Sequence, residues 1–298
     1  MIERQSLVTY WLPSVGIGQE GQMKIVHVPL LDILNYKRAD GSLQVDVVNL
    51  WGASFTLPSV FPTIPLALDP DLEKALTDGS VQKLQAAGVK VVLTIAGSGG
   101  NSVGWDSVPA ASIYPFAKYL DETILGEAGY GLDGVDIDAE YARQGTGTLP
   151  AVVRAMRETF PSTKIISKAL WSDLGIIREI APDLSFGSIM TYGDDAGGLE
   201  SIFNSYVEHG MAPEKMAIGV SAGPVGHGPQ FTSIPTAQAL AGWQPANGRK
   251  MGMMVWSFSQ DIQQFTAWPQ NQPDKTFPNP DDHSVQRAII RVFDEVAP

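Results

Sequence analysis

The chain has 298 residues, of which 44% are hydrophobic and 17% are charged. This composition supplies a large apolar core and excludes a disordered protein, and the length suits one barrel domain of about 250 residues or two ordinary domains. The formal net charge of -12 repels phosphate backbones and anionic lipids, so neither nucleic acid nor a membrane is an expected partner. Cysteine is absent, which excludes disulfide frameworks, thiolate metal sites and cysteine nucleophiles.

Apolar β-rich runs alternate with helix-period segments along the whole chain. The predicted strands are Leu7–Leu12, Val45–Leu50, Val89–Ala96, Gly134–Asp138, Lys164–Leu170, Phe186–Tyr192, Lys215–Val220 and Met251–Phe258. The clearest predicted helices are Leu72–Ala87, Ser112–Ala128, Leu149–Phe160, Leu199–His209 and Ser284–Val296. Near-continuous apolar strands are typical of a parallel sheet that is covered on both faces. The alternation predicts an α/β fold, a (β/α)8 TIM barrel forming a single domain over residues 1–298, with a doubly wound open sheet as the structural alternative.

One predicted strand carries a row of acids within the segment GLDGVDIDAEY at residues 131–141. Asp136, Asp138 and Glu140 occupy alternate positions, so their carboxylates share one face of the strand. Same-face neighbours lie about 7 Å apart, where like charges repel by roughly 2 kcal/mol at an effective dielectric constant near 20. We therefore expect this coupled set to keep at least one proton near neutral pH. Such a carboxylic acid suits general acid catalysis, and Glu140 falls at the C-terminal strand end, where barrel active sites lie.

Two other interpretations of the acid row remain open at this stage. The acids could bind a hard cation such as calcium or magnesium, although strand-borne acids without the glycine of an EF-hand loop make a poor cage. They could instead belong to a solvated edge strand, but the apolar Val135 and Ile137 on the opposite face argue against exposure. General acid catalysis is the interpretation that we carry forward.

The string DGVDIDAE, from Asp133 to Glu140, resembles the D-x-x-D-x-D-x-E signature of glycoside hydrolase family 18. Residues 91–97 (VVLTIAG) resemble the third-strand motif of the family, with Thr94 where serine is usual. Residues 190–192 (MTY) and 254–257 (MVWS) resemble its sixth-strand and eighth-strand motifs. Within the family, the chain is most similar to the endoglycosidase H type of endo-β-N-acetylglucosaminidase, because a Gly/Thr-rich loop follows the acid row and Gly193 follows Tyr192.

The resemblance implies a role for each matching residue. Glu140 would protonate the leaving glycosidic oxygen and then activate water. Asp138 would hold the 2-acetamido group of the substrate, whose carbonyl oxygen attacks the anomeric carbon and gives an oxazolinium intermediate, with retention of configuration. Tyr192 would hydrogen-bond the acetamido oxygen, and Asp136 would share a proton with Asp138.

The same resemblance implies structural support from Asp133 and Gly134, and neither a metal nor an organic cofactor. Tryptophans near the predicted C-terminal strand ends add a separate indication, because sugars pack their C–H faces on flat aromatic rings. Trp256 is expected to floor the sugar pocket. The other expected substrate-binding residues are Met190, Trp171, Trp51, Trp105 and Asp194. Any single tryptophan could equally well be a core residue.

Three functions are compatible with these features. The leading hypothesis is an endo-β-N-acetylglucosaminidase that cleaves the β-1,4 bond between the two core N-acetylglucosamines of N-linked glycans. The second is a chitinase, and the third is an inactive glycan-binding relative, although the terminal acid that such relatives typically lose is present. We expect a monomer with a substrate glycan that contains N-acetylglucosamine. Because such glycans are met outside the cell, we expect a secreted protein, with the cytoplasm as the alternative; residues 1–6 show no basic segment followed by an apolar one.

Overall fold

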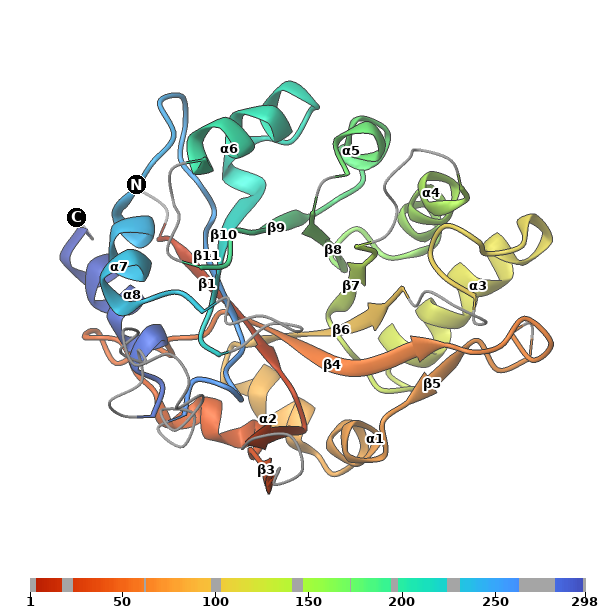
Figure 1. The fold of residues 1–298 in the computed structure, drawn as a ribbon. Helices are drawn as coiled ribbons and strands as arrows, with labels where there is room; N and C mark the ends of the chain where they lie inside the picture. The colour runs from red at the N-terminus through yellow and green to blue at the C-terminus, as the bar shows by residue number, and fades with distance from the viewer. Residues whose placement is uncertain are drawn as a thin grey trace.

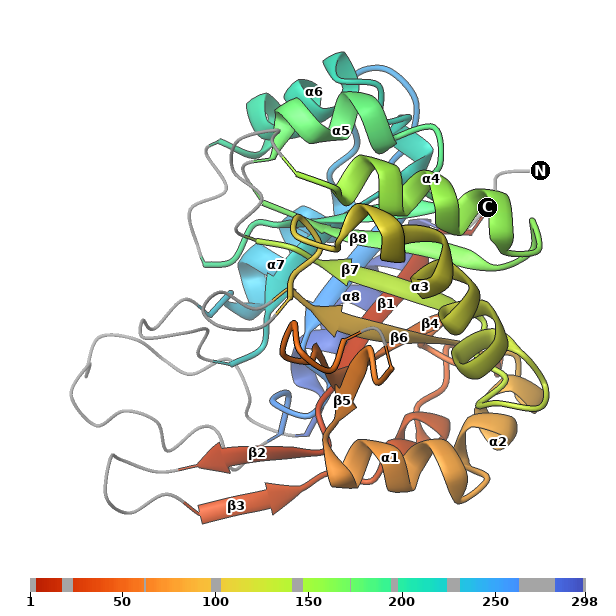
Figure 2. The ribbon, with the colours of Figure 1, turned by 90° about the vertical axis from the view of Figure 1, so that its right-hand side faces the viewer.

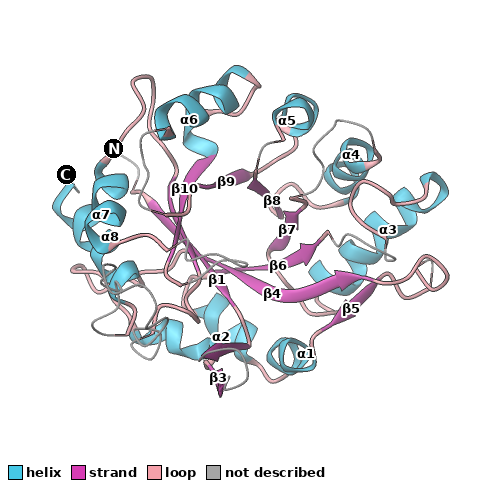
Figure 3. Cartoon of the chain, in the orientation of Figure 1, coloured by secondary structure: helices cyan, strands magenta, loops and turns pink. Residues whose placement is uncertain are grey.

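Eight parallel strands form a closed barrel with helices around its outside (Figures 1 and 3). The computed structural model describes residues 4–17, 24–61, 63–97, 103–140, 147–171, 173–193, 198–223, 231–262 and 282–296. Around the barrel the strands are β1 (Ser6–Trp11), β4 (Val47–Phe55), β6 (Lys90–Ala96), β7 (Gly134–Asp138), β8 (Ile165–Leu170), β9 (Phe186–Met190), β10 (Met216–Ser221) and β11 (Gly252–Trp256). The predicted TIM barrel is confirmed, and each of the eight predicted strands overlaps one of these.

The barrel closes where the first strand meets the last one. β1 pairs in parallel with β11, in the register Ser6↔Gly252, and on its other side with β4, in the register Val8↔Val47. A side chain at Gly252 would overlap the backbone of Ser6, so this seam requires glycine. The remaining barrel neighbours follow one another along the chain, as expected for repeated β-α-β units.

Helices pack on the outer surface of the barrel between consecutive strands. They are α1 (Pro70–Thr77), α2 (Ser80–Ala86), α3 (Ile113–Tyr119), α4 (Leu149–Thr159), α5 (Leu174–Ile180), α6 (Leu199–Glu208), α7 (Ile234–Gly242) and α8 (Ser284–Val296). The predicted helix Leu72–Ala87 is two helices, because Gly79 adopts a φ of 86° between α1 and α2. A π-helix, η3 (Leu120–Leu125), continues α3. The short helices α5 and α7 were not predicted. In α7 the reason is that the segment is rich in small apolar residues and shows little helical periodicity.

Additional short elements lie at the C-terminal end of the barrel strands. β2 (Ser14–Ile17) and β3 (Lys24–His27) form an antiparallel ribbon that extends beyond the barrel strands (Figure 2). The short helix η1 (Leu30–Asn35) follows this ribbon, and β5 (Leu66–Leu68) pairs antiparallel with the end of β4. These elements were not predicted, because three or four residues give too little periodicity to identify a strand.

The apolar core has two parts, as expected for a barrel with an outer helical layer. The inner cluster fills the barrel and contains Val8, Tyr10, Val47, Val92, Ala169, Phe186, Met190, Ala217 and Met254. The larger cluster lies between the strands and the helices. Within the described ranges, every helix is too short or too polar to cross a lipid bilayer.

Candidate active site

The acid row lies on β7 and points into the barrel. Asp136 and Asp138 belong to the strand and are buried, with exposed fractions of 1% and 8%. Glu140 follows two residues after the last strand residue and is half-buried. The three carboxyls therefore rise from the barrel interior toward its C-terminal mouth, so solvent access increases toward the terminal acid.

Asp136 is held by hydroxyl groups from three other strands. Its Oδ2 accepts hydrogen bonds from Tyr10 Oη of β1 at 2.8 Å and from Thr94 Oγ1 of β6 at 3.1 Å. Its Oδ1 accepts a hydrogen bond from Ser167 Oγ of β8 at 2.6 Å. Burial raises the pKa of Asp136, and these hydrogen bonds oppose that shift. The deepest acid is thus fixed in position by donors to both oxygens.

Asp138 lies in a different environment, only two residues further along the same strand. Burial, followed by the negative charges of Glu140 and Asp136, raises the pKa of Asp138 to about 7, while Lys168 acts in the opposite direction. Its buried Oδ1 has no hydrogen-bond partner among the described residues. The raised pKa agrees with the expectation that the row keeps a proton near neutral pH. Within the part of the chain that the structure describes, Oδ1 of Asp138 remains an acceptor without a donor.

Tyr192 follows β9 and faces the same carboxyls. Burial and then the charges of Asp138 and Glu140 raise the pKa of Tyr192 well above its ordinary value. The phenol therefore stays protonated across the physiological range and can donate a hydrogen bond. The next residue, Gly193, has a φ of 100°, and its N–H donates to Thr232 Oγ1 at 3.2 Å.

Two half-buried tryptophans stand at the mouth beside the acid row. The ring centroids of Trp51, on β4, and Trp256, the last residue of β11, lie 5.0 Å apart in an edge-to-face arrangement. Tyr10 packs against both rings, with centroid distances of 6.5 Å to Trp51 and 5.1 Å to Trp256. Because Tyr10 also binds Asp136, the aromatic cluster and the acids form one connected site.

The structure corrects the expected role of Trp105 in substrate binding. Its side chain is 1% exposed, and its Nε1 donates to the backbone oxygen of Ile95 at 2.8 Å. The ring packs against Phe55 and Phe116, with centroid distances of 5.2 Å and 6.0 Å. Trp105 is therefore a core residue, because neither its ring faces nor its N–H remain for a sugar.

The other expected substrate-binding residues lie in different places. Met190 belongs to the inner cluster of the barrel, against which Tyr192 and Trp256 also pack. Trp171 follows β8 and is 41% exposed, but it lines a pocket of about 280 Å³ that also involves Leu174 of α5 and Ile202 of α6. Met190 lines the same pocket, whereas Trp51 and Trp256 do not. Asp194 lies outside the described residues.

The two expected support residues have clear structural tasks. Asp133 Oδ2 accepts hydrogen bonds from Val91 N at 3.0 Å and Gln85 Nε2 at 2.9 Å, and Oδ1 lies 2.9 Å from Lys90 Nζ. Burial raises the pKa of Asp133, but these partners outweigh burial and leave that pKa below its ordinary value. A side chain at Gly134 would overlap the backbone of Ile165 on β8. Both residues therefore fix β7 against its neighbours.

Several residues of the site were not singled out from the sequence. Tyr10 and Ser167 bind Asp136 from β1 and β8, and the period-two pattern of each strand could have placed them on the inner face. Lys168 points to the outer side of β8, where its Nζ lies 2.5 Å from Asp173 Oδ2 and both side chains are buried. The sequence of β8 alone could not predict that Lys168 pairs with Asp173, because the contacts of an outward-facing side chain depend on which segments pack against the strand. Within the described ranges, no cluster of His, Asp or Glu side chains is arranged to hold a metal ion.

A closed barrel with an acid row and paired tryptophans at its mouth defines a carbohydrate-active enzyme. The family described as the endo-beta-N-acetylglucosaminidase EndoS TIM-barrel domain matches residues 53–255, which is more than half of the chain. The chain belongs to this family and is a glycosidase. The predicted resemblance to glycoside hydrolase family 18 and the predicted enzyme class are thereby confirmed.

Individual relatives carry related names and share the fold. Endo-beta-N-acetylglucosaminidase F2 of Elizabethkingia meningoseptica is 24% identical over 279 residues, covering 83% of this chain and 82% of that protein. An endo-beta-N-acetylglucosaminidase from Cordyceps militaris superposes with a TM-score of 0.64 at 19% identity, covering 98% of this chain and 91% of that one. A family GH18 chitinase from Chromobacterium violaceum superposes with a TM-score of 0.66 at 20% identity, covering 97% and 83%. At these identities the structural matches show the fold alone.

Proposed function

We propose that the protein is an endo-β-N-acetylglucosaminidase that cleaves the β-1,4 bond between the two core N-acetylglucosamines of N-linked glycans. The observation that carries this proposal is the contrast within the acid row. Asp136 is bound by three hydroxyls, whereas Asp138 keeps a buried oxygen without a partner among the described residues. An unused acceptor beside a general acid suits a substrate that brings its own N–H donor, as an acetamido group does.

The proposed reaction begins when the acetamido N–H of the substrate donates to Asp138. Its carbonyl oxygen then attacks the anomeric carbon while Glu140 gives a proton to the leaving oxygen, which forms an oxazolinium ion and releases the second sugar. Tyr192, which stays protonated, donates to the acetamido oxygen and orients its attack. Glu140 next removes a proton from water, which opens the oxazolinium ring with net retention, and the carboxyl recovers its acid form.

The electrostatics of the row support this division of roles. Because the pKa of Asp138 is about 7, both its protonated and its charged form are populated near neutral pH, and a small change in its surroundings shifts the balance between them. Asp136 lies two residues away and can take part in this exchange, because burial raises its pKa as well. A negative charge on Asp138 stabilises the positive oxazolinium ion, and protonation of the pair relieves the repulsion before substrate binds.

A chitinase that uses the same chemistry on linear N-acetylglucosamine polymers is the second candidate, because the catalytic groups would serve both substrates. Incubation with a high-mannose glycoprotein and, in parallel, with a chitin oligomer separates the two functions. We expect deglycosylation, seen as a gel shift, with the glycoprotein and no shortened products from chitin. The reverse result would make the protein a chitinase, and an absence of products from both would contradict the proposal.

We also propose that the enzyme acts outside the cell, because protein-bound glycans of this kind are met there. Immunodetection of the native protein in the medium and in the cell fraction tests this proposal. A protein confined to the cytosolic fraction would contradict it.

A further inference from the structure

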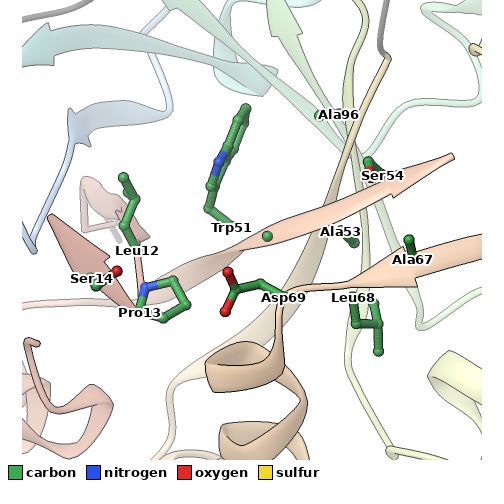
Figure 4. A pocket seen from close by; sticks show the side chains of 11 residues that line it. Leu12, Pro13, Ser14, Trp51, Ala53, Ser54, Ala67, Leu68, Asp69 and Ala96 are labelled. Atoms are coloured by element: carbon green, nitrogen blue, oxygen red, sulfur yellow. The ribbon is translucent and has the colours of Figure 1, made fainter. Parts of the chain in front are cut away.

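A pocket of about 510 Å³ lies beside the catalytic mouth, over the end of β4 (Figure 4). Trp51 and Ser54 of β4, Ala67 of β5, Ala96 of β6 and Asp69 are among the residues that line it. Its volume falls within the range of small-ligand sites, which is about 300–1,000 Å³. The proposed mechanism does not use this pocket, which we call the side pocket.

The side pocket adjoins the catalytic groups at two points. Trp51 forms a shared wall, because its ring lines the side pocket and also packs edge-to-face against Trp256 at 5.0 Å. Ala96 is the register partner of Asp138 on the neighbouring strand. A glycan that places one sugar over the acid row can therefore extend a second part across Trp51 into this space.

Asp69 supplies an acidic hydrogen-bond acceptor to the side pocket. It is the N-cap of α1, and its Oδ1 accepts hydrogen bonds from Asp71 N at 2.9 Å and Leu72 N at 3.4 Å. Among the described residues, no donor contacts Oδ2. Figure 4 shows the carboxylate directed toward Trp51 and Pro13. Helix capping therefore holds the carboxylate in place through one oxygen and leaves the other for a ligand.

An indole wall beside a fixed carboxylate fits a neutral sugar with several hydroxyl groups. The C–H face of a hexose packs on the aromatic ring, while its hydroxyls donate charge-assisted hydrogen bonds to the carboxylate. We propose that the side pocket binds a hexose branch of the glycan and that Asp69 determines specificity for branched over linear substrates. This inference rests on the proposed function, because a linear N-acetylglucosamine polymer has no branch to place there.

Two substitutions test the side pocket in different ways. Asp69→Ser keeps a good N-cap for α1 but removes the oxygen that faces the pocket. Ala67→Phe fills the pocket from an exposed position on β5. Asp71→Ser is the matched control, because it makes the same chemical change at an exposed residue two positions along, outside the pocket lining. Each is combined with Glu140→Gln, so that bound glycans are not consumed during titration.

The measurement is the Kd of a high-mannose glycopeptide and of a chitin oligomer, followed by calorimetry. We expect Asp69→Ser to weaken glycopeptide binding about tenfold, the effect of losing one charge-assisted hydrogen bond. Ala67→Phe should weaken it at least as much, whereas chitin binding and the Asp71→Ser control should stay within about twofold. Unchanged glycopeptide binding in both variants, or an equal loss for both glycans, would overturn the inference. If the unmodified enzyme cleaves neither glycan, the proposed function fails, and the binding comparison still decides the role of the pocket.

Discussion

Asp138→Asn is expected to stabilise the folded protein increasingly as the pH rises from 4 to 8. The pKa of this carboxyl rises from 3.8 to about 7 on folding, mainly because it is buried and then because Glu140 and Asp136 repel its charge. A raised carboxyl pKa means that the folded state binds the proton more tightly. The contribution of this tighter proton binding to the unfolding free energy is fully present below the unfolded-state pKa, near 4, and is lost as the pH rises through the folded-state pKa of about 7.

The size of the effect follows from the two pKa values. A difference of about three pKa units corresponds to about 4 kcal/mol of unfolding free energy at pH 8, where Asp138 must carry its charge in the folded state. Asparagine has the shape of the protonated acid and carries no charge, so it avoids this loss. We expect the variant to match the unmodified protein at pH 4 and to exceed its stability by a few kcal/mol at pH 8.

Urea unfolding at one-unit intervals from pH 4 to pH 8 measures this difference. Asp133→Asn is the control on the same β-strand segment, because its partners lower the pKa of Asp133. That variant should lose stability above pH 4, the opposite sign from Asp138→Asn. A stability difference for Asp138→Asn that is constant with pH, or that becomes unfavourable at pH 8, would refute the electrostatic account of the row.

Three further predictions concern catalysis and packing. Glu140→Gln should slow hydrolysis by several orders of magnitude in a product-release assay while glycan binding is retained; near-normal turnover would exclude its acid role. A substrate analogue with a plain 2-hydroxyl at the cleaved residue should be inert by chromatography of the products, since it brings no nucleophile, and its rapid cleavage would exclude substrate assistance. Gly134→Ala should lower the unfolding free energy by about 1–3 kcal/mol, because the methyl group overlaps Ile165; unchanged thermal stability would contradict that packing.

The sequence predicted the barrel well because its strands are buried on both faces and therefore form continuous apolar runs. It failed where local geometry interrupts a pattern. Leu72–Ala87 has the spacing of one helix, yet Gly79 with its positive φ divides it into α1 and α2. The ribbon of β2 and β3 also escaped prediction, because its four-residue strands are held by pairing with each other rather than by a periodic core face.

The site was predictable where its residues lie on one strand. Asp136, Asp138 and Glu140 share a face by alternation alone, and a coupled set with a retained proton follows from their spacing. Ser167 is the register partner of Asp136 on the neighbouring strand β8, and Tyr10 reaches Asp136 from β1, which does not adjoin β7. Both contacts therefore depend on the register around the barrel, which the sequence of one strand does not show. Trp105 was placed wrongly for a related reason, since distance along the chain from a strand end does not show that Phe55 and Phe116 enclose its ring.

The seam between β1 and β11 has a consequence for how the protein is made. Ser6 finds its partner Gly252 only after nearly the whole chain has left the ribosome, so the first strand must wait with an open edge during synthesis. Unpaired edges of apolar strands invite association with other chains. A chain that ends before Gly252 would therefore lack β11 and aggregate rather than form a smaller working enzyme, and slow translation of β11 would lengthen the time for which this edge of β1 is unpaired.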